Sequence, residues 1–591
     1  MYGFYNKLLK IDVTDNSFES IEITDELLRE QMGGKGLASH LLMQLNPPGV
    51  DPLGPDNHLI FSVGPVAATR VWGSCRYGVF TKSPQTGFYA ESYSGGTVAE
   101  YIAATGYDAI VFHGRSEELV WVEVSDDTVR FHSAEQLRGL DTYATEDRIK
   151  QWISANRPET PKCGVSVVGP AAENGVTFAL IENDYWRSAG RTGAGAVLGA
   201  KNIKAIAFHG RQKAEVADPK LVAAFARELS ERSKTDNGVK AYKKLGTPMM
   251  VDVLNEARAF PTRYWSKGQS EHRENINATA LHERCEVRPN ACRKCFMACG
   301  RLSTVKSGKH QGLTVEGPEY ETIYAFGGLC EVDNIEDILY LNDLCDRLGM
   351  DTITAGNLVG LAIEAVLQGR IELDLSYGDT EAIARLLRDI AYRQGYGDVL
   401  ADGIKVAAEQ WDMVDQAIHV KGLEPAGYDP RVLKGMGLAY GTSARGACHL
   451  RATFYKPEIT GMSDPEKIQG KSEMFVEWED RLTFFDTLIL CRFYRDMYQW
   501  QELATMVKGV TGLDLSEQAM VAISRRITDN TRLFNIREGL TVEDDRLPKR
   551  FAREVLPESG RVISEENMTI LLGNYYKTRG WDEEGIPVPK G

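Results

Sequence analysis

The stretch C-R-K-C-F-M-A-C, residues 292–299, places Cys292, Cys295 and Cys299 within one short loop. Three thiolates this close together can hold three corners of a four-iron four-sulfur cube, and the fourth ligand can come from a distant part of the chain. Cysteine pairs at this spacing also build tetrahedral zinc sites. The spacing alone therefore predicts a metal-binding loop and leaves zinc and iron-sulfur as alternatives.

The segments on either side of this loop differ in hydrophobic periodicity, and this difference predicts the fold. Residues 7–13 and 18–23 alternate around a turn at 14–17, as the strands of a hairpin do. Further extended runs lie at 58–63, 77–81, 108–113, 120–124, 128–132 and 204–208. After about Gly210 apolar residues recur at helical spacing, most clearly in 219–234, 334–348, 380–411 and 516–538.

A chain of 591 residues is too long for one hydrophobic core. We therefore expect an α+β protein with a sheet-rich N-terminal cofactor-binding domain at 1–210, followed by two mainly helical domains at 211–418 and 419–591.

Composition excludes several classes of protein. The formal net charge of -15 argues against a general nucleic-acid binder, because phosphate contacts need clustered lysines and arginines. No run of about 18 apolar residues is present, so no membrane span is expected. The first residues lack the pattern of an export signal, which makes the cytoplasm the expected location.

The number of cysteines is also compatible with metal binding. Ten cysteines in a long cytoplasmic chain are better interpreted as metal ligands or small buried apolar residues than as disulfides. The candidates for a fourth ligand are Cys75, Cys163, Cys285, Cys330, Cys345, Cys448 and Cys491. Any one of these without a partner is more simply a buried hydrophobic residue.

An ordered series of further motifs resembles the aldehyde ferredoxin oxidoreductase family over essentially the whole chain, from Tyr2 to Trp581. The shared motifs are R-Y at 76–77, T-K-S-P-Q-T-G-F at 81–88, S-G-G at 94–96, R-S-A-G-R at 187–191, the cysteine triplet, E-G-P-E-Y-E at 316–321, D-R-L-G-M-D at 346–351, C-H at 448–449, and Asp486 five residues before Cys491. The resemblance implies a tungsten bis-pterin centre, with molybdenum as the alternative metal, beside one 4Fe-4S cluster. It makes Cys491 the fourth cluster ligand and removes the zinc alternative.

The resemblance also assigns cofactor-binding positions. Asp346, Met350 and Asp351 match the motif that holds one pterin, and Asp486, Leu490, Cys491 and Arg492 match the motif that holds the other. An ionised aspartate suits this role because its two oxygens can accept the N-H groups of the pterin edge. Other positions implied to bind the cofactors are Arg76, Tyr93, Gly95, Arg187, Ser188, Gly190, Arg191 and Arg451.

The glycine-rich segment 187–199, R-S-A-G-R-T-G-A-G-A-V-L-G, combines cations with free backbone N-H groups, which suits the pterin phosphates. The resemblance also implies a magnesium ion that bridges these phosphates. A dinucleotide-binding turn is the alternative. The spacing is G-x-G-x-x-x-G, and the strand that follows ends in His209 rather than an acidic residue, which disfavours a nicotinamide site.

Glu321 and His449 match the family's catalytic pair, and both residue types suit proton transfer. The implied reaction is oxidation of an aldehyde to a carboxylic acid, with electrons passed through the cluster to ferredoxin or an iron-sulfur partner subunit. The alternatives are the tungsten subunit of a benzoyl-CoA reductase-type ring-reducing complex and an electron-transfer scaffold that has lost tungsten.

The chain departs from the family at a few positions. Tyr340 and Asp343 replace the Glu-x-x-His ligands of an iron that bridges two subunits, so an oligomer by that route is not expected. Ile489 replaces a glycine ahead of the Leu-Cys pair, Cys75 stands where glycine is common, and Tyr93 replaces a smaller polar residue. These changes put local geometry in doubt rather than the cofactor set.

Overall fold

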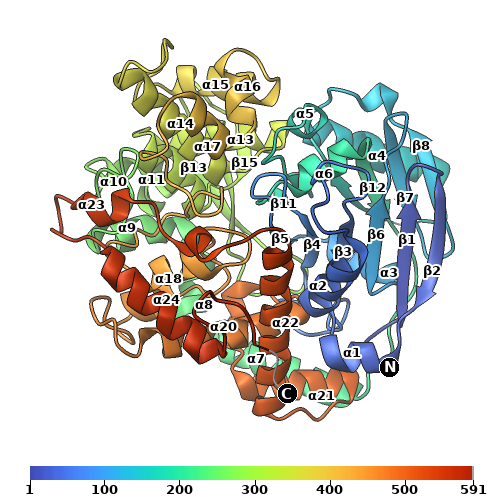
Figure 1. Ribbon diagram of the computed structural model, residues 1–591. Coiled ribbons are helices and arrows are strands. Elements are labelled where there is room, and N and C mark those ends of the chain that lie inside the picture. Colours follow the sequence, from blue (N-terminus) through green and yellow to red (C-terminus); the bar gives the residue numbers. More distant parts are fainter. Residues whose placement is uncertain (161, 589–591) are drawn as a thin grey trace.

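The computed structural model describes residues 1–160 and 162–588, and its N-terminal part contains two six-stranded mixed sheets (Figure 1). The first sheet has the order β2 (Ser17–Glu22), β1 (Lys7–Asp12), β6 (Ala109–His113), β3 (Leu59–Ser62), β4 (Tyr77–Lys82), β5 (Tyr89–Ser94). The second has the order β11 (Arg187–Ala189), β10 (Ile181–Asn183), β9 (Gly164–Val167), β12 (Ile203–Phe208), β7 (Val120–Val124), β8 (Val129–Ser133). In each sheet one pair is parallel, β1 with β6 and β12 with β7, and the other pairs are antiparallel.

Alternation along the strands explains how these sheets stack. In β12, Ile206 and Phe208 point into the largest core, whereas Ala205 and Ala207 point to the opposite face. The rings of Phe61 and Phe208 lie 5.8 Å apart, so the two sheets pack face to face. Helices cover the outer faces, which gives four layers.

The helices of this part either cover the sheets or connect their strands. They are α1 (Asp25–Gln31), α2 (Gly34–Leu45), α3 (Val98–Ala104), η1 (Glu135–Leu137), α4 (Thr142–Asn156), α5 (Pro170–Glu173) and α6 (Ala194–Ala200). Helix α2 packs on the first sheet through Leu37 and Leu41, and α4 packs on the second through Ile149 and Ile153.

The remainder is mainly helical, with one small antiparallel sheet of β13 (Cys285–Asn290), β14 (Gly300–Val305) and β15 (Thr314–Glu316). Its first helical elements are α7 (Pro219–Thr235), α8 (Asn237–Leu245), η2 (Thr247–Met249), α9 (Met250–Glu256), α10 (Arg273–Ile276), α11 (Ala278–Arg284), α12 (Tyr320–Thr322), η3 (Ile323–Leu329), α13 (Ile335–Leu348), α14 (Thr352–Leu367), α15 (Thr380–Ala391), α16 (Tyr396–Ala401) and α17 (Ile404–Gln410). The later ones are α18 (Lys434–Thr442), α19 (Tyr455–Ile459), α20 (Lys471–Thr487), η4 (Arg492–Tyr494), α21 (Trp500–Thr511), α22 (Glu517–Arg537), η5 (Val542–Asp545), α23 (Arg550–Arg553) and α24 (Glu565–Arg579). The predicted fold class, sheets first and helices after, is confirmed.

The helical pattern predicted over 380–411 is broken into α15, α16 and α17. Gly395 and Gly403 adopt φ angles of 52° and 91°, which interrupt the helix at both junctions. The other long helices lie close to their expected bounds.

The largest hydrophobic core extends from Leu9 in the first sheet to Trp581 near the C-terminus. The proposed domain boundaries therefore divide the chain into units that share a core. In Figure 1, β5 and β11 lie between the other strands and the helical part. No helix within the described residues is long and apolar enough to cross a membrane.

Candidate functional site

Four cysteine sulfurs lie on the wall of one buried cavity between the sheets and the helices. Cys292, Cys295 and Cys299 come from the loop between β13 and β14, and Cys491 comes from the segment after α20. The backbone N-H of Gly96 donates to the sulfur of Cys292 at 3.2 Å, and the hydroxyl of Tyr494 donates to that of Cys295 at 3.5 Å. The structure thus brings the predicted fourth ligand to the triplet across nearly two hundred residues of sequence.

Arg76 and Gly95 complete the surroundings of the sulfurs. The Nη1 atom of Arg76 lies 3.9 Å from the sulfur of Cys491, and its Nη2 atom donates to the carbonyl of Tyr93 at 2.7 Å. A Cβ atom on Gly95 would lie 2.9 Å from the sulfur of Cys292, so only glycine fits without displacing the cysteine loop.

The remaining cysteines divide into two groups. Cys75 lines the cavity, and its thiol donates a hydrogen bond to the sulfur of Cys292. Cys448 is buried beside His449, and its sulfur accepts from Arg445 Nη2 at 2.8 Å. Cys448 does not line the cavity, and neither do Cys163, Cys285, Cys330 and Cys345. Within the described chain, no three Cys, His, Asp or Glu side chains are close enough to hold a single metal ion.

The predicted catalytic pair faces this cavity from two separate elements. Glu321 lies in α12, directly before the π-helical segment η3, and His449 lies in the loop between α18 and α19. The Nε2 atom of His449 is 3.5 Å from Oε1 of Glu321, longer than a hydrogen bond. The other oxygen of Glu321 accepts from the backbone N-H of Gly427 at 2.9 Å.

Burial sets the protonation of this pair. It raises the pKa of Glu321 to about 7, because the carboxylate loses its hydration. The pKa of His449 is held well below its usual value, first by burial and then by the charges of Arg191 and Arg445. Near neutral pH, His449 is therefore neutral and Glu321 is poised between its two protonation states.

Glu319, two residues before Glu321, also lines the cavity. It accepts a hydrogen bond from the hydroxyl of Thr247. Glu319 and Glu321 thus have different hydrogen-bond partners, although they are only two residues apart in the sequence.

Asp486 is clamped by two arginines at the cavity wall. Its Oδ2 atom accepts from Arg451 Nη1 at 2.5 Å and from Arg492 Nη2 at 2.6 Å. Leu490 and Tyr93 line the same wall, and the ring of Tyr93 lies under the guanidinium of Arg451 at 4.9 Å.

The first aspartate motif lies where α13 ends and α14 begins. Gly349 ends α13 with a left-handed conformation. Asp351 lines the cavity, but its carboxylate caps α14 and accepts from Arg191 Nε at 3.1 Å. Met350 is buried and Asp346 is half-buried, and neither lines the cavity. Asp346 accepts a hydrogen bond from Asn342 at 2.7 Å.

The segment predicted to serve phosphates also reaches the cavity. Arg187, Ser188, Gly190 and Arg191 line it from β11 and the turn after it. Arg187 forms an ion pair with Glu316, and Arg191 is buried and donates to the carbonyl of Glu424 at 2.7 Å.

Sequence reasoning missed several charged residues near the site. Glu91 is fully buried in β5 and pairs with Lys35 at 3.0 Å and with Arg451 at 3.1 Å. Glu182 is fully buried in β10, and neither of its oxygens has a hydrogen-bond partner in the described structure. The nearby charge of Asp346 is the largest cause, after burial, that raises the pKa of Glu182 well above its usual value. Single charged residues inside short strands leave no sequence pattern.

Several buried hydrogen-bond donors on the cavity wall have no partner within the described residues, and they indicate which kind of cofactor the cavity fits. The Nε atoms of Arg445, Arg451 and Arg495 and the indole N-H of Trp186 have no hydrogen-bond partner within the described residues, and all four side chains line the cavity. Buried polar groups are almost always paired, so these donors suit an anionic ligand. The arginines, together with the four thiols, fit a phosphate-bearing bis-pterin group next to an iron-sulfur cluster.

The departures noted in the sequence have structural outcomes. Ile489 keeps a left-handed φ of 48°, so the turn that usually holds glycine is retained by a β-branched residue at some cost in strain. Tyr340 accepts from Arg388 at 2.7 Å and Asp343 accepts from Arg347 at 2.7 Å. Both side chains that stand at the family's iron-ligand positions thus form hydrogen bonds within the chain.

A cavity that joins four cysteine sulfurs, a buried Glu-His pair and arginines whose Nε-H groups have no partner within the described residues is typical of a redox enzyme with an anionic cofactor. Family models agree: aldehyde ferredoxin oxidoreductase, N-terminal domain, matches residues 8–210, and aldehyde ferredoxin oxidoreductase, domains 2 and 3, matches residues 224–590. The chain belongs to the aldehyde ferredoxin oxidoreductase family, and it is an oxidoreductase.

Individual relatives cover the whole chain. The tungsten-containing aldehyde ferredoxin oxidoreductase of Thermococcus kodakarensis is 36% identical over 100% of this chain and 98% of the relative. The enzyme of the same name from Pyrococcus furiosus is 33% identical over the same shares. An aliphatic sulfonate oxidoreductase, WOR-like subunit, from P. furiosus is 27% identical over 99% of this chain and 96% of the relative.

Among solved structures, a chain of the active site complex BamBC of benzoyl coenzyme A reductase in complex with 1,5-dienoyl-CoA matches with a TM-score of 0.85. It covers 99% of this chain and 96% of that chain at 23% identity, which shows a shared fold.

Proposed function

We propose that this protein oxidises an aldehyde to a carboxylic acid and exports the electrons through a 4Fe-4S cluster to ferredoxin or an iron-sulfur partner. The observation that carries the proposal is the approach of His449 to Glu321, at 3.5 Å, on the same cavity as the four cysteine sulfurs. The relatives named as tungsten-containing aldehyde ferredoxin oxidoreductases support the choice of substrate class and metal.

The residues of this chain would hold the cofactors in the following way. Cys292, Cys295, Cys299 and Cys491 would ligate the cluster, and Arg76 would neutralise its thiolates. The unpaired guanidinium N-H groups of Arg445, Arg451 and Arg495 would bind pterin phosphates. When bound, the tungsten-pterin group supplies a metal centre able to accept two electrons.

The acid-base pair has complementary tasks. Neutral His449 retains a ring N-H that can donate to the oxygen of an aldehyde and draw charge from the carbonyl carbon. Glu321, when ionised, can accept a proton from the water that adds to that carbon. Because Gly427 already holds one oxygen of Glu321, the other oxygen is directed towards the cavity.

The test is reduction of benzyl viologen by protein purified without oxygen, with a panel of aldehydes and with benzoyl-CoA in parallel reactions. The proposal predicts aldehyde-dependent dye reduction in the wild type. Replacement of His449 by Asn should lower the rate by about 10²–10⁴-fold while tungsten and iron contents stay unchanged. Reduction of the aromatic ring of benzoyl-CoA without turnover of any aldehyde would contradict it.

A further inference from the structure

A large surface groove of about 1240 Å³ lies directly behind the cysteine loop. Its floor includes Arg293 and Lys294, the two residues between Cys292 and Cys295. The backbone of this loop is held from below, because Arg293 donates to the carbonyl of Gly96 and Gly73 donates to that of Lys294. The groove therefore adjoins the loop that carries two predicted cluster ligands, Cys292 and Cys295.

The groove is positively charged although the chain as a whole carries a charge of -15. Its lining side chains include seven lysines and arginines and four acidic residues. The basic ones are Arg130, Arg157, Lys162, Arg211, Lys213, Arg293 and Lys294, and the acidic ones are Glu100, Asp126, Asp127 and Glu159.

Ion pairing inside the groove leaves this excess uncompensated. Glu100 is shared by Arg293 at 2.7 Å and Lys294 at 2.8 Å, so two cations face one carboxylate. Arg130 and Arg157 likewise share the buried Glu123, at 3.4 Å and 2.9 Å.

Two further lysines add to the excess. Lys162 and Lys213 are exposed and, over the described part of the chain, form no salt bridge or side-chain hydrogen bond.

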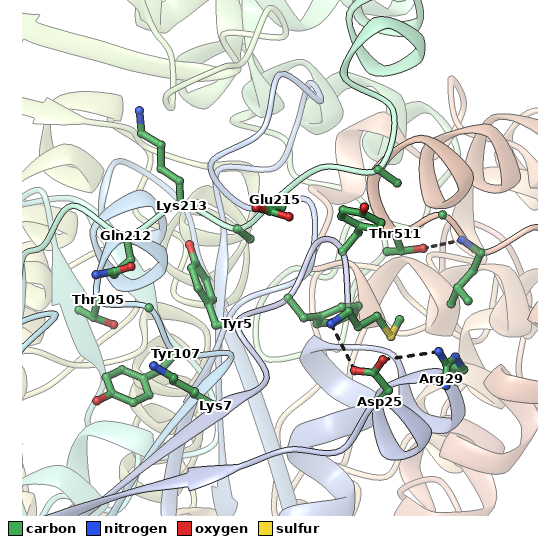
Figure 2. Close-up of a pocket in the computed structure, with 18 of the residues that line it drawn as sticks. Tyr5, Lys7, Asp25, Arg29, Thr105, Tyr107, Gln212, Lys213, Glu215 and Thr511 are labelled. Carbon is green, nitrogen blue, oxygen red and sulfur yellow. Dashed lines mark hydrogen bonds and ion pairs between the residues drawn. The ribbon is translucent and has the colours of Figure 1, made fainter.

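The neighbouring pocket offers a contrast within the same surface. Figure 2 shows this pocket, in which Asp25 pairs both with the N-terminal amine and with Arg29, while Lys213 extends away from the other labelled side chains. Its lining has three lysines and arginines, the N-terminal amine and three acidic residues, so its excess of positive charge is one, against three in the groove. The groove behind the cysteine loop is thus the more positively charged of the two.

We infer that this groove is the docking site of an acidic, freely exchanging iron-sulfur electron carrier. The inference deepens the proposed function, since it depends on electrons leaving by way of the cluster. Opposite charges steer carriers to such a surface and raise the association rate. A lining dominated by charged and small side chains suits a transient encounter, because permanent interfaces are more apolar.

The inference is tested with the loaded enzyme and an acidic two-cluster bacterial-type ferredoxin as the probe. The variant K162E/K213E reverses two exposed charges that form no salt bridge or side-chain hydrogen bond within the described residues. The matched control, K467E/K577E, makes the same charge change at two exposed lysines that do not line the groove, one in the loop before α20 and one in α24. Ferredoxin reduction is measured at low and high salt, and ferredoxin binding is titrated without aldehyde.

At low ionic strength, the groove variant should lose about ten- to hundredfold in kcat/KM for ferredoxin and bind it correspondingly more weakly. The difference should shrink at high salt, and the rate with viologen should stay at the wild-type value. An equal loss in the control, no loss in the groove variant, or a partner that stays bound through high salt would overturn the inference. If ferredoxin binds in the groove but no aldehyde is oxidised, only the proposed function fails.

Discussion

Glu321 gives the sharpest prediction, because its pKa places a titration inside an accessible pH range. A carboxyl with an ordinary pKa of 4.5 is fully ionised above pH 6, whereas Glu321 has a pKa raised by burial to about 7. At pH 6 about one Glu321 in ten is ionised, and at pH 8 about nine in ten. If the ionised form accepts the proton, kcat should rise about tenfold between pH 6 and pH 8.

The assay is the pH dependence of kcat for aldehyde-dependent viologen reduction at saturating aldehyde. His449 remains neutral throughout this range because its pKa is lowered, so it contributes no second transition there. The variant E321Q should lose about 10²–10⁴-fold in kcat together with the rise near pH 7. The matched variant E319Q removes the neighbouring carboxyl that bonds to Thr247, and it should keep the midpoint. A wild-type profile that is flat from pH 6 to pH 8, or a rise that survives in E321Q, would refute the reasoning.

Two further predictions address the cluster and the fold. Replacing Cys75 with Gly removes the S-H group that donates to Cys292. The midpoint potential of the cluster, followed by electron paramagnetic resonance, should become more negative by about 20–40 mV, and an unchanged or more positive potential would count against this hydrogen bond. Asp545 is fully buried between Lys421 at 2.8 Å and Arg532 at 2.7 Å, so Asp545→Ala leaves two buried cations uncompensated. Its free energy of unfolding should fall by about 3–5 kcal/mol, which denaturant titration would measure, and a loss below about 1 kcal/mol would show that the network is not stabilising.

Local patterns were sufficient for much of the fold. The hairpin of β1 and β2 and helices such as α13 and α22 follow directly from alternation, caps and helical spacing. The break within 380–411 was missed, because a glycine inside an amphipathic pattern is compatible with a continuous helix as well as with a turn. Only the tertiary structure shows that Gly395 and Gly403 adopt positive φ angles.

The site was predictable to a smaller extent. The cysteine triplet is visible from spacing, but nothing near Cys491 marks it as a partner, and only the family resemblance selected it. The family resemblance assigned Asp346, Met350 and Asp351 to one pterin, and of these three only Asp351 lines the cavity. Glu182 and Glu91 gave no signal, because their importance comes from burial next to charges of distant segments.

The most direct test of the central claim is metal analysis with electron paramagnetic resonance on protein purified without oxygen from cells grown with tungstate. The proposed function predicts about four irons and one tungsten per chain, with a reduced-cluster signal that is lost in Cys491→Ala. A wild-type protein that contains zinc instead of iron, or a Cys491→Ala variant that keeps an intact four-iron cluster, would contradict it.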